Sequence, residues 1–428
     1  MKINRNDKII QLNLEYFIAK RLITAKSHKS SISGPIIKIA VAAIAIGMVM
    51  MIVSVATGIG LKQKIRHKVA AFNGHMVISN YDDNLSEESL VPISIHQDFY
   101  PKFKAVPEVT HIQVVATKAG IIRTETDFEG IIFKGIGKDY QWENINEYIV
   151  EGRAPELKTD LNAEVLISKY LADRLKLKLG DKFTTFFLKN EANKLPNRRT
   201  FTIVGIFNSG FQEFDANYII GDIRHVQRIN KWEPDQVGSF EVFVDDFDDI
   251  ENIGLNVYNN SFNKTDASQP FDTRTVLERY YFIFEWLKMF DINIQIILIV
   301  MIVVATINMV VALLVLILER TQMIGILKAI GANNWTVRKV FLYNALYLIM
   351  KGLFWGNLIG IGMIVLQDRF GIIKLNPENY YVNEAPVYID VFYIFLLNAI
   401  TVLICFIVLL VPSYIITKIS PVKAIRYN

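Results

Sequence analysis

The chain has 428 residues, of which 52% are hydrophobic, and its formal net charge at pH 7 is +4. A soluble domain is about 45–50% apolar, so this content argues against a purely soluble protein and predicts an integral membrane protein. Residues 61–284 hold 27 Lys and Arg against 33 Asp and Glu. A slightly acidic insert therefore interrupts a basic frame, and the net charge is no sign of nucleic-acid binding.

The N-terminal segment, residues 1–38, is polar for longer than the charged region of a cleaved signal peptide. It therefore predicts a retained membrane anchor at the first apolar run. Within this segment, apolar residues at helical spacing predict a short amphipathic helix on the membrane surface, with Arg21 as an exception on the same face. These residues are Leu14, Phe17, Ile18, Leu22 and Ala25.

Four apolar runs reach the roughly 20 residues that a helix needs to cross a hydrocarbon core. They are residues 39–61, 292–318, 340–367 and 391–411. Lys351 alone interrupts the third run, and Pro412 follows the fourth. The sequence thus predicts a membrane protein with four transmembrane α-helices and a large α+β domain between helices 1 and 2.

Lys and Arg near the membrane predict which segments lie in the cytoplasm. They gather in residues 1–38, in the loop 319–339 and in the tail 412–428. The domain 62–284 and the loop 368–389 then face the periplasm. One cluster opposes this orientation, because it follows the first span on the outer side: Lys62, Lys64, Arg66 and Lys68.

The insert alternates β-rich runs with turn residues. Strands are predicted at residues 75–79, 130–134, 182–188, 200–207, 216–220 and 239–245. Helices are predicted at 162–179, with Gly180 as the residue after the helix end, and at 245–258. This mixture defines the α+β domain.

No constellation predicts catalysis or metal binding. The six histidines show neither HExxH nor a paired metal spacing. Cys405 is the only cysteine and lies in an apolar run, which is typical of a small buried side chain. We expect no enzyme activity, cofactor or metal in this chain.

The loop after the second span predicts a short helix between two membrane spans. Met323, Ile326, Leu327 and Ile330 are spaced to form one apolar face, and Gly331 ends the helix. A new helix begins near Trp335. Such a helix either receives the push of a partner protein or rests on lipid headgroups.

The same loop resembles a known family. Residues 319–332, with Glu-Arg, Ile-Gly-Ile-Leu-Lys-Ala and Gly-Ala, are similar to the signature of the FtsX-like permeases, and residues 419–426 resemble their closing motif. Residues 72–78, 211–215 and 380–383 are most similar to the lipoprotein-releasing branch. The resemblance covers nearly the whole chain.

The resemblance implies that the loop helix is a coupling helix seated on a cytoplasmic ABC ATPase dimer. The residues implied in that contact are Glu319, Arg320, Ile324, Gly325, Ile326, Leu327 and Lys328. Lys328 and Arg320 would meet acidic groups at the rim of the ATPase groove. The chain lacks the GxxxxGK[ST] loop that cradles phosphates, so ATP and Mg would bind to a separate ATPase chain.

Three further sets of residues have both a structural and a functional interpretation. Gly352, Gly356 and Gly360 allow close helix approach, either within one chain or between chains. Apolar residues in the outer half of the first span either line a cleft for lipoprotein or face lipid: Met48, Met51, Ile52 and Val55. Phe211 and Phe214 either form a gate or a docking site on the periplasmic domain, or fill its core.

The resemblance further implies a permease that, with a second copy or a paralogue, extracts lipoproteins from the outer leaflet of a bacterial inner membrane. A soluble periplasmic carrier would receive the lipoprotein. One alternative is an efflux permease of the MacB type, although that branch commonly carries its ATPase on the same chain. The other is a cell-division-type permease that activates a cell-wall hydrolase, although those chains have a smaller outer domain.

Overall fold

The computed structural model describes residues 15, 17–19, 21, 33–83, 86–125, 127–157, 160–188, 195–261 and 270–421. The chain divides into two compact units. Unit 1 comprises Met1–Leu61, Lys288–Ile373 and Ala385–Asn428, and unit 2 comprises Lys62–Leu287 and Lys374–Glu384. Unit 1 holds the membrane spans, and unit 2 is an α/β domain.

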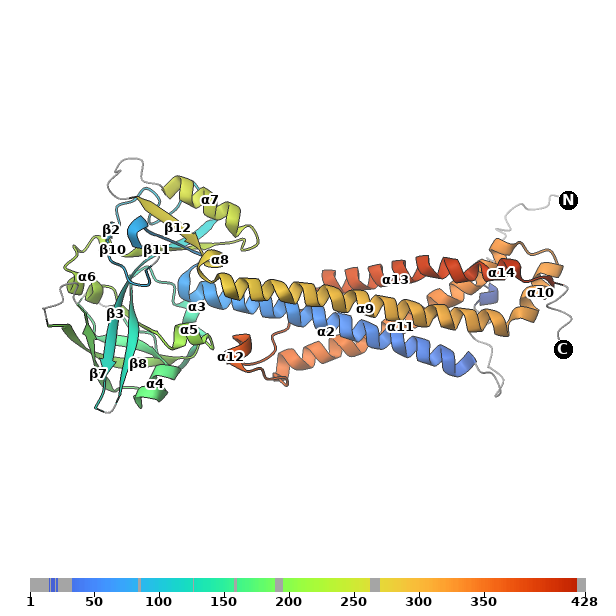
Figure 1. Ribbon diagram of the computed structural model, residues 1–428, viewed down its shortest axis with the longest axis horizontal. Helices are drawn as coiled ribbons and strands as arrows, with labels where there is room; N and C mark the ends of the chain where they lie inside the picture. The colour runs from blue at the N-terminus through green and yellow to red at the C-terminus, as the bar shows by residue number, and fades with distance from the viewer. Residues whose placement is uncertain are drawn as a thin grey trace, which may run out of the picture. The chain divides into compact units, whose positions relative to one another are not determined.

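Unit 1 is built on four long helices, α2 (Ser33–Asn73), α9 (Tyr281–Glu319), α11 (Asn334–Phe370) and α13 (Val391–Ser413), which pack side by side (Figure 1). Each is long and apolar enough to cross a membrane. The prediction of four membrane helices is confirmed. The helices α2 and α9 extend beyond the predicted spans and contribute residues to both units.

The core of unit 1 takes residues from all four helices. Met48 of α2, Met309 of α9, Phe341 of α11 and Leu409 of α13 are fully buried in one cluster. Cys405 is also fully buried there as a free thiol. Burial of such side chains maximises dispersion contacts, which drive helix packing where lipid replaces water.

Part of the predicted N-terminal amphipathic helix is described. Phe17 and Ile18 are helical; Phe17 is exposed, and Ile18 packs against the core of unit 1. Leu14, Leu22 and Ala25 lie outside the described residues.

Unit 2 contains a ten-stranded mixed sheet in the order β12-β1-β11-β3-β4-β9-β6-β8-β5, with β7 pairing with β3 and β8. The strands are β1 (Met76–Asn80), β3 (Val109–Arg123), β4 (Phe128–Ile136), β5 (Ile149–Gly152), β6 (Glu164–Ser168), β7 (Lys182–Phe187), β8 (Asn197–Phe207), β9 (Tyr218–Asp222), β11 (Ser239–Val244) and β12 (Phe271–Thr275). A separate pair joins β2 (Ile93–Ser94) and β10 (Gln236–Val237).

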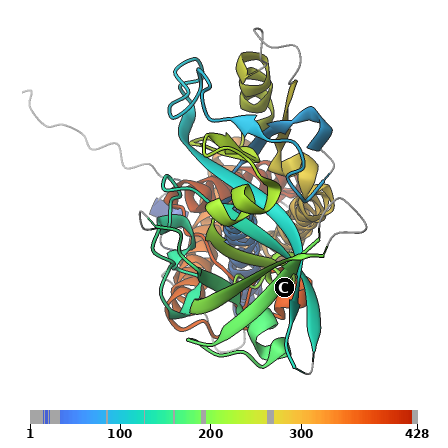
Figure 2. The same ribbon diagram turned by 90° about the vertical axis from the view of Figure 1, so that its left-hand side faces the viewer.

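Six of these strands close into a ring, β3-β4-β9-β6-β8-β7, because β7 pairs with both β8 and β3. The long strand β3, cyan in Figure 2, runs diagonally across the domain and also pairs with β11 outside the ring. Phe133, Phe187 and Phe201 are fully buried and their rings contact one another. Ring closure removes exposed strand edges.

Short helices complete unit 2: α3 (Glu143–Asn146), α4 (Lys169–Leu175), α5 (Gln212–Asp215), α6 (Arg224–Asn230), α7 (Ile250–Ser261), α8 (Val276–Arg279), α12 (Pro377–Tyr380) and the 3-10 turn η1 (Tyr81–Asp83). The segment holding α12 belongs to this unit, although it lies between two membrane helices in the sequence. The helix predicted at 245–258 begins later than expected, at Ile250.

The prediction of a helix over 162–179 is wrong in its first part. Residues 164–168 form β6, which lies between β8 and β9. Val165, Leu166 and Ile167 are all fully buried, as expected for a strand covered on both faces. The Ser168 side chain then caps α4, and Lys176, not Gly180, takes the left-handed conformation at its end.

Candidate functional site

The first candidate site is the helix between spans two and three, α10 (Thr321–Ala329). Gly331 has a φ of +97°, a conformation that side chains rarely adopt, and it ends the turn after α10. The Asn333 side chain then accepts a hydrogen bond from the amide of Trp335 at 3.3 Å and starts α11. The structure has this helix, and its end, at the positions that the sequence predicts.

The exposed face of α10 differs from the predicted one. Ile324 and Gly325 are buried inside the chain, which removes them from any partner contact. Leu327 is half-buried against the core of unit 1. Ile326 and Ile330 are exposed, by 49% and 76%. Two exposed apolar side chains one helical turn apart are available for contact with lipid or a partner protein.

Lys328 was expected to contact acidic groups of an ATPase, but its side chain bonds to its own chain. Its ammonium donates to the carbonyls of Ile416 at 2.6 Å, Thr417 at 3.3 Å and Ile419 at 2.9 Å. Ile416 and Thr417 lie in α14 (Ile415–Lys418), and Ile419 follows it. The carbonyl of Ile416 also accepts from the amide of Ile419 at 3.4 Å. Burial lowers the pKa of Lys328. Of the other residues implied in the ATPase contact, Glu319 is exposed and Arg320 half-buried.

The three glycines of span three allow α11 to approach α2 within one chain. A Cβ on Gly352 would lie 2.7 Å from Ile44, and one on Gly356 would lie 2.6 Å from Met48. A Cβ on Gly360 would lie 3.2 Å from Ile52. The interpretation as packing within the chain is the one that this geometry supports.

The cleft predicted along span one is not open in this structure. Met48, Met51 and Ile52 are 2% exposed or less, because they pack into the unit 1 core. Val55 is half-buried and, with Ile52, borders a shallow groove beside Tyr388 and Tyr393. Within one chain these three residues therefore line no open cleft, and a role for them toward lipoprotein stays a prediction.

A pair of asparagines joins α11 to α13. The amide of Asn357 donates to Asn398 Oδ1 at 2.8 Å, and Asn398 returns a bond to Asn357 Oδ1 at 3.0 Å. Neither was singled out from the sequence. The available signal was the presence of two amides within apolar spans, where an unpaired polar group is costly.

The second candidate site is a cluster in unit 2, the aromatic junction, formed by Phe72, Phe211, Phe214, Tyr280 and Tyr381. Phe72 and Phe214 lie 4.5 Å apart by ring centroids. Phe211 packs between Tyr280 at 5.7 Å and Tyr381 at 5.6 Å. The three segments whose motifs resemble the lipoprotein-releasing branch therefore meet here. Phe211 and Phe214 are each 1% exposed, so they fill the core and offer no docking surface.

Polar contacts fix the loop of α12 to the same junction. The Lys68 ammonium donates to the carbonyl of Tyr381 at 2.6 Å. The Asp215 carboxylate accepts from the backbone amides of Ser209 at 3.2 Å and Gly210 at 3.0 Å, and burial raises its pKa. The Lys68 contact anchors loop 374–384 to the α/β domain, while Asp215 holds the neighbouring turn at residues 209–210.

The basic cluster that opposed the predicted orientation has partners within unit 2. Lys64 pairs with Glu147 at 2.9 Å, and Arg66 pairs with Asp248 at 2.6 Å. Lys68 is bonded as described above. These cations contact the folded domain, so they need not be counted as membrane topology signals.

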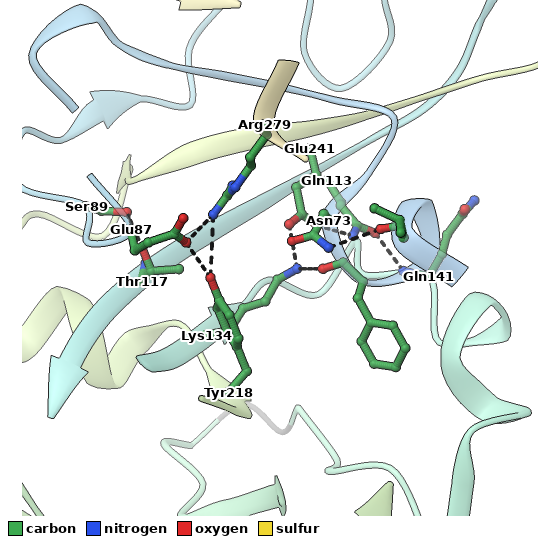
Figure 3. A network of polar contacts seen from close by, with 12 residues as sticks. Asn73, Glu87, Ser89, Gln113, Thr117, Lys134, Gln141, Tyr218, Glu241 and Arg279 are labelled. Carbon is green, nitrogen blue, oxygen red and sulfur yellow. Dashed lines mark hydrogen bonds and ion pairs between the residues drawn. The ribbon is translucent and has the colours of Figure 1, made fainter. Parts of the chain in front are cut away.

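A buried polar network connects the end of α2 and the residues that precede α9 to the sheet (Figure 3). The Lys134 ammonium donates to the Glu241 carboxylate and to the carbonyl of Phe72, at the end of α2. Gln113 donates to the second Glu241 oxygen at 2.8 Å. Burial lowers the pKa of Lys134, and the charge of Glu241 opposes this. Lys134 and Glu241 are 2% and 4% exposed.

Beside this pair, the network reaches the residues that precede α9. Tyr280 donates to the Asn73 side chain at 2.9 Å. The Glu87 carboxylate accepts from Tyr218 at 2.6 Å and from Arg279 (Figure 3). These contacts line a polar pocket in which the main charges are already paired. No local pattern in the sequence predicts the network, because its members come from seven separate segments.

Within the described residues, no group of three His, Cys, Asp or Glu side chains is arranged to hold a metal ion. His75 accepts a hydrogen bond from the Val244 amide at 2.9 Å, and burial lowers its pKa to about 4. It is therefore a neutral structural acceptor near pH 7.

Comparisons with known proteins agree with this architecture. Residues 39–254 match the family described as MacB-like periplasmic core domain, and residues 295–421 match FtsX-like permease C-terminal. The lipoprotein-releasing system transmembrane protein LolC of Neisseria meningitidis serogroup B is 25% identical, covering 97% of this chain and 100% of that protein. The corresponding LolE of Haemophilus influenzae is 20% identical, covering 88% and 90%.

A solved structure also resembles part of the chain. The periplasmic region of MacB from Actinobacillus actinomycetemcomitans is 14% identical and covers 49% of this chain and 91% of that one, with a TM-score of 0.31.

Proposed function

Since the chain belongs to the FtsX-like permease family and carries a MacB-like periplasmic core domain, we propose that it is the permease of an ATP-driven system that releases lipoproteins from a bacterial inner membrane. The observation that carries this proposal is the nearly full-length similarity to proteins named as lipoprotein-releasing transmembrane subunits. The permease is not itself catalytic.

We place both termini, α10 and α14 in the cytoplasm and the α/β domain in the periplasm. The basic residues of segments 1–38, 319–339 and 412–428 support this orientation. The one cluster that opposed it has partners within unit 2.

ATP and Mg bind, in this proposal, to a separate cytoplasmic ATPase dimer that presses on α10. The exposed side chains of Ile326 and Ile330 provide the apolar contact, with Glu319 at its edge. Motion of α10 passes through the turn at Gly331 into α11, whose glycines lie against α2. The network around Lys134 then receives motion from the end of α2 and from Tyr280, which directly precedes α9.

The cargo of this cycle is a lipoprotein in the outer leaflet, and the receiver is a soluble periplasmic carrier. A second permease, either a copy of this chain or a paralogue, completes the transporter. Because Met48, Met51 and Ile52 are buried within one chain, the lipid-binding surface requires either another chain or a rearrangement of α2 against α11.

An efflux permease is the second candidate, favoured by the match to the MacB-like periplasmic core. The absence of GxxxxGK[ST] in the sequence argues against it. Measuring which cargo stimulates ATP hydrolysis distinguishes the two functions. Stimulation by lipoprotein would indicate a release permease and not an efflux permease.

Ile326→Asp is expected to abolish co-purification of the ATPase while the permease remains folded. Ile326 is 49% exposed, so a carboxylate there stays hydrated in the free chain but would be desolvated in an apolar contact. Affinity purification followed by quantification of the ATPase measures the effect. Leu255→Asp, at an exposed leucine of α7, is the control. Full ATPase recovery with Ile326→Asp would remove α10 as the coupling helix.

A further inference from the structure

Lys328 occupies all three donors of its ammonium within its own chain. The acceptors are the carbonyls of Ile416, Thr417 and Ile419, at 2.6 to 3.3 Å. Ile416 is fully buried in the unit 1 core, so its side chain attaches α14 to that core while Lys418 stays exposed. The contact therefore joins the middle of the chain to its C-terminal segment.

A second cation holds the preceding turn. The Arg338 guanidinium, near the start of α11, donates to Ser413 Oγ at 3.0 Å and to the carbonyl of Leu410 at 2.9 Å. It also stacks over Trp335, 5.0 Å from the ring centroid. Arg338 thus joins α11 to the end of α13, whereas Lys328 joins α10 to α14.

We infer that Lys328 is a positioning residue that makes α10 and the C-terminal end of α13–α14 move as one body, so that a displacement of α10 reaches span four as well as span three. The inference rests on the proposed function, because it assigns the route by which a conformational change of the ATPase reaches the membrane spans. Without Lys328, the covalent turn at Gly331 would still carry the motion into α11. Span four would then lose the hydrogen bonds that Lys328 makes to α14 and would follow α10 through side-chain packing in the unit 1 core.

The charge of Lys328 suits this role better than that of a partner contact. An ammonium with three carbonyl acceptors has no remaining donor for an ATPase carboxylate. Arg338 keeps α13 attached when Lys328 is removed, so Lys328→Met is expected to fold. Methionine has an unbranched side chain of similar length, and it removes the donors together with the charge.

The test measures release and hydrolysis separately. In the complete complex, Lys328→Met is expected to retain the ATPase and its hydrolysis rate, while lipoprotein released per ATP falls about tenfold. Lys328→Arg, which keeps donors and charge, should restore most of the release. Lys418→Met, at an exposed lysine of α14, is the matched control. Unchanged release per ATP in Lys328→Met, or loss of the ATPase itself, would overturn the positioning role.

A distance measurement keeps the inference independent of transport. Spin labels at Ala329→Cys and Lys418→Cys, both exposed sites, can be placed in a Cys405→Ala background. With Lys328 present, the distance distribution between the labels should be narrow and unchanged by ATP. With Lys328→Met it should broaden even without nucleotide. An equally narrow distance distribution in Lys328→Met would refute the link between α10 and α14. If the distribution broadens in Lys328→Met but the unmodified protein binds no ATPase, the link stands and the proposed function is refuted.

Discussion

Lys134→Met is expected to lower the melting temperature of the full-length protein in detergent by about 10 °C. Lys134 and Glu241 form a buried ion pair, and removal of one partner leaves an uncompensated buried charge at a cost of about 3–5 kcal/mol. In a domain of this size, about 1 kcal/mol shifts the melting temperature by about 2–4 °C. The carbonyl of Phe72 also loses its donor. Intrinsic tryptophan fluorescence during heating measures the change.

Two variants control for this result. Lys182→Met changes an exposed lysine at the start of β7 and should leave the melting temperature within about 2 °C. Lys134→Met combined with Glu241→Gln removes both charges and should recover much of the loss, because Gln113 can still donate to the new amide oxygen. If Lys134→Met alone melted like the unmodified protein, the network would not hold the end of α2.

Gly356→Leu is expected to disrupt the packing of α11 on α2 and to lower the yield of folded protein. A Cβ at this position would lie 2.6 Å from Met48 Cβ and 2.9 Å from the Ala45 carbonyl. The second contact is with backbone, so a rotamer change cannot relieve it. Overpacking of this kind costs about 1–3 kcal/mol or more. Resistance to unfolding by sodium dodecyl sulfate measures the loss.

The same helix supplies the control for this prediction. A Cβ on Gly362 would meet nothing within 4 Å. Gly362→Leu should therefore unfold like the unmodified protein or slightly later, since leucine favours helix over glycine by somewhat under about 1 kcal/mol. Equal losses in the two variants would show that the glycines matter for some reason other than contact with α2.

Local features of the sequence determine several parts of this structure. The membrane helices follow from uncharged apolar runs, and the end of α10 follows from the glycine at 331, whose φ of +97° favours that residue. Most predicted strands lie within or beside observed ones, such as β8 at Asn197–Phe207. These elements depend on composition and on neighbours in the chain.

Features set by distant contacts were not predictable. The run at residues 164–168 became a strand because β8 and β9 flank it, although its sequence also suits a helix. Strand β3 was missed although residues such as Val114 and Val115 favour a strand, whereas its pairing with β7, which closes the ring, depends on distant contacts. Span one is apolar on all sides, so its pattern could not distinguish buried Met48 from a lipid-facing side chain.

The face of α10 shows the same limit in a functional site. Helical spacing grouped Ile326 with Leu327, but only Ile326 is exposed, because Leu327 packs against the unit 1 core. Lys328 looked like a surface cation, whereas its acceptors lie at the far end of the sequence. No spacing rule places residues 416–419 beside residue 328.

The central claim is that this permease, with a separate ATPase, releases lipoproteins from the membrane. The direct measurement is purification of the full chain from its native membrane in detergent, with mass spectrometry of what co-purifies before and after ATP and Mg are added. We predict an ABC ATPase and acylated lipoproteins, with the lipoproteins released on ATP addition. Recovery of an ATPase with a cell-wall hydrolase, and no lipoprotein before or after ATP, would contradict the account.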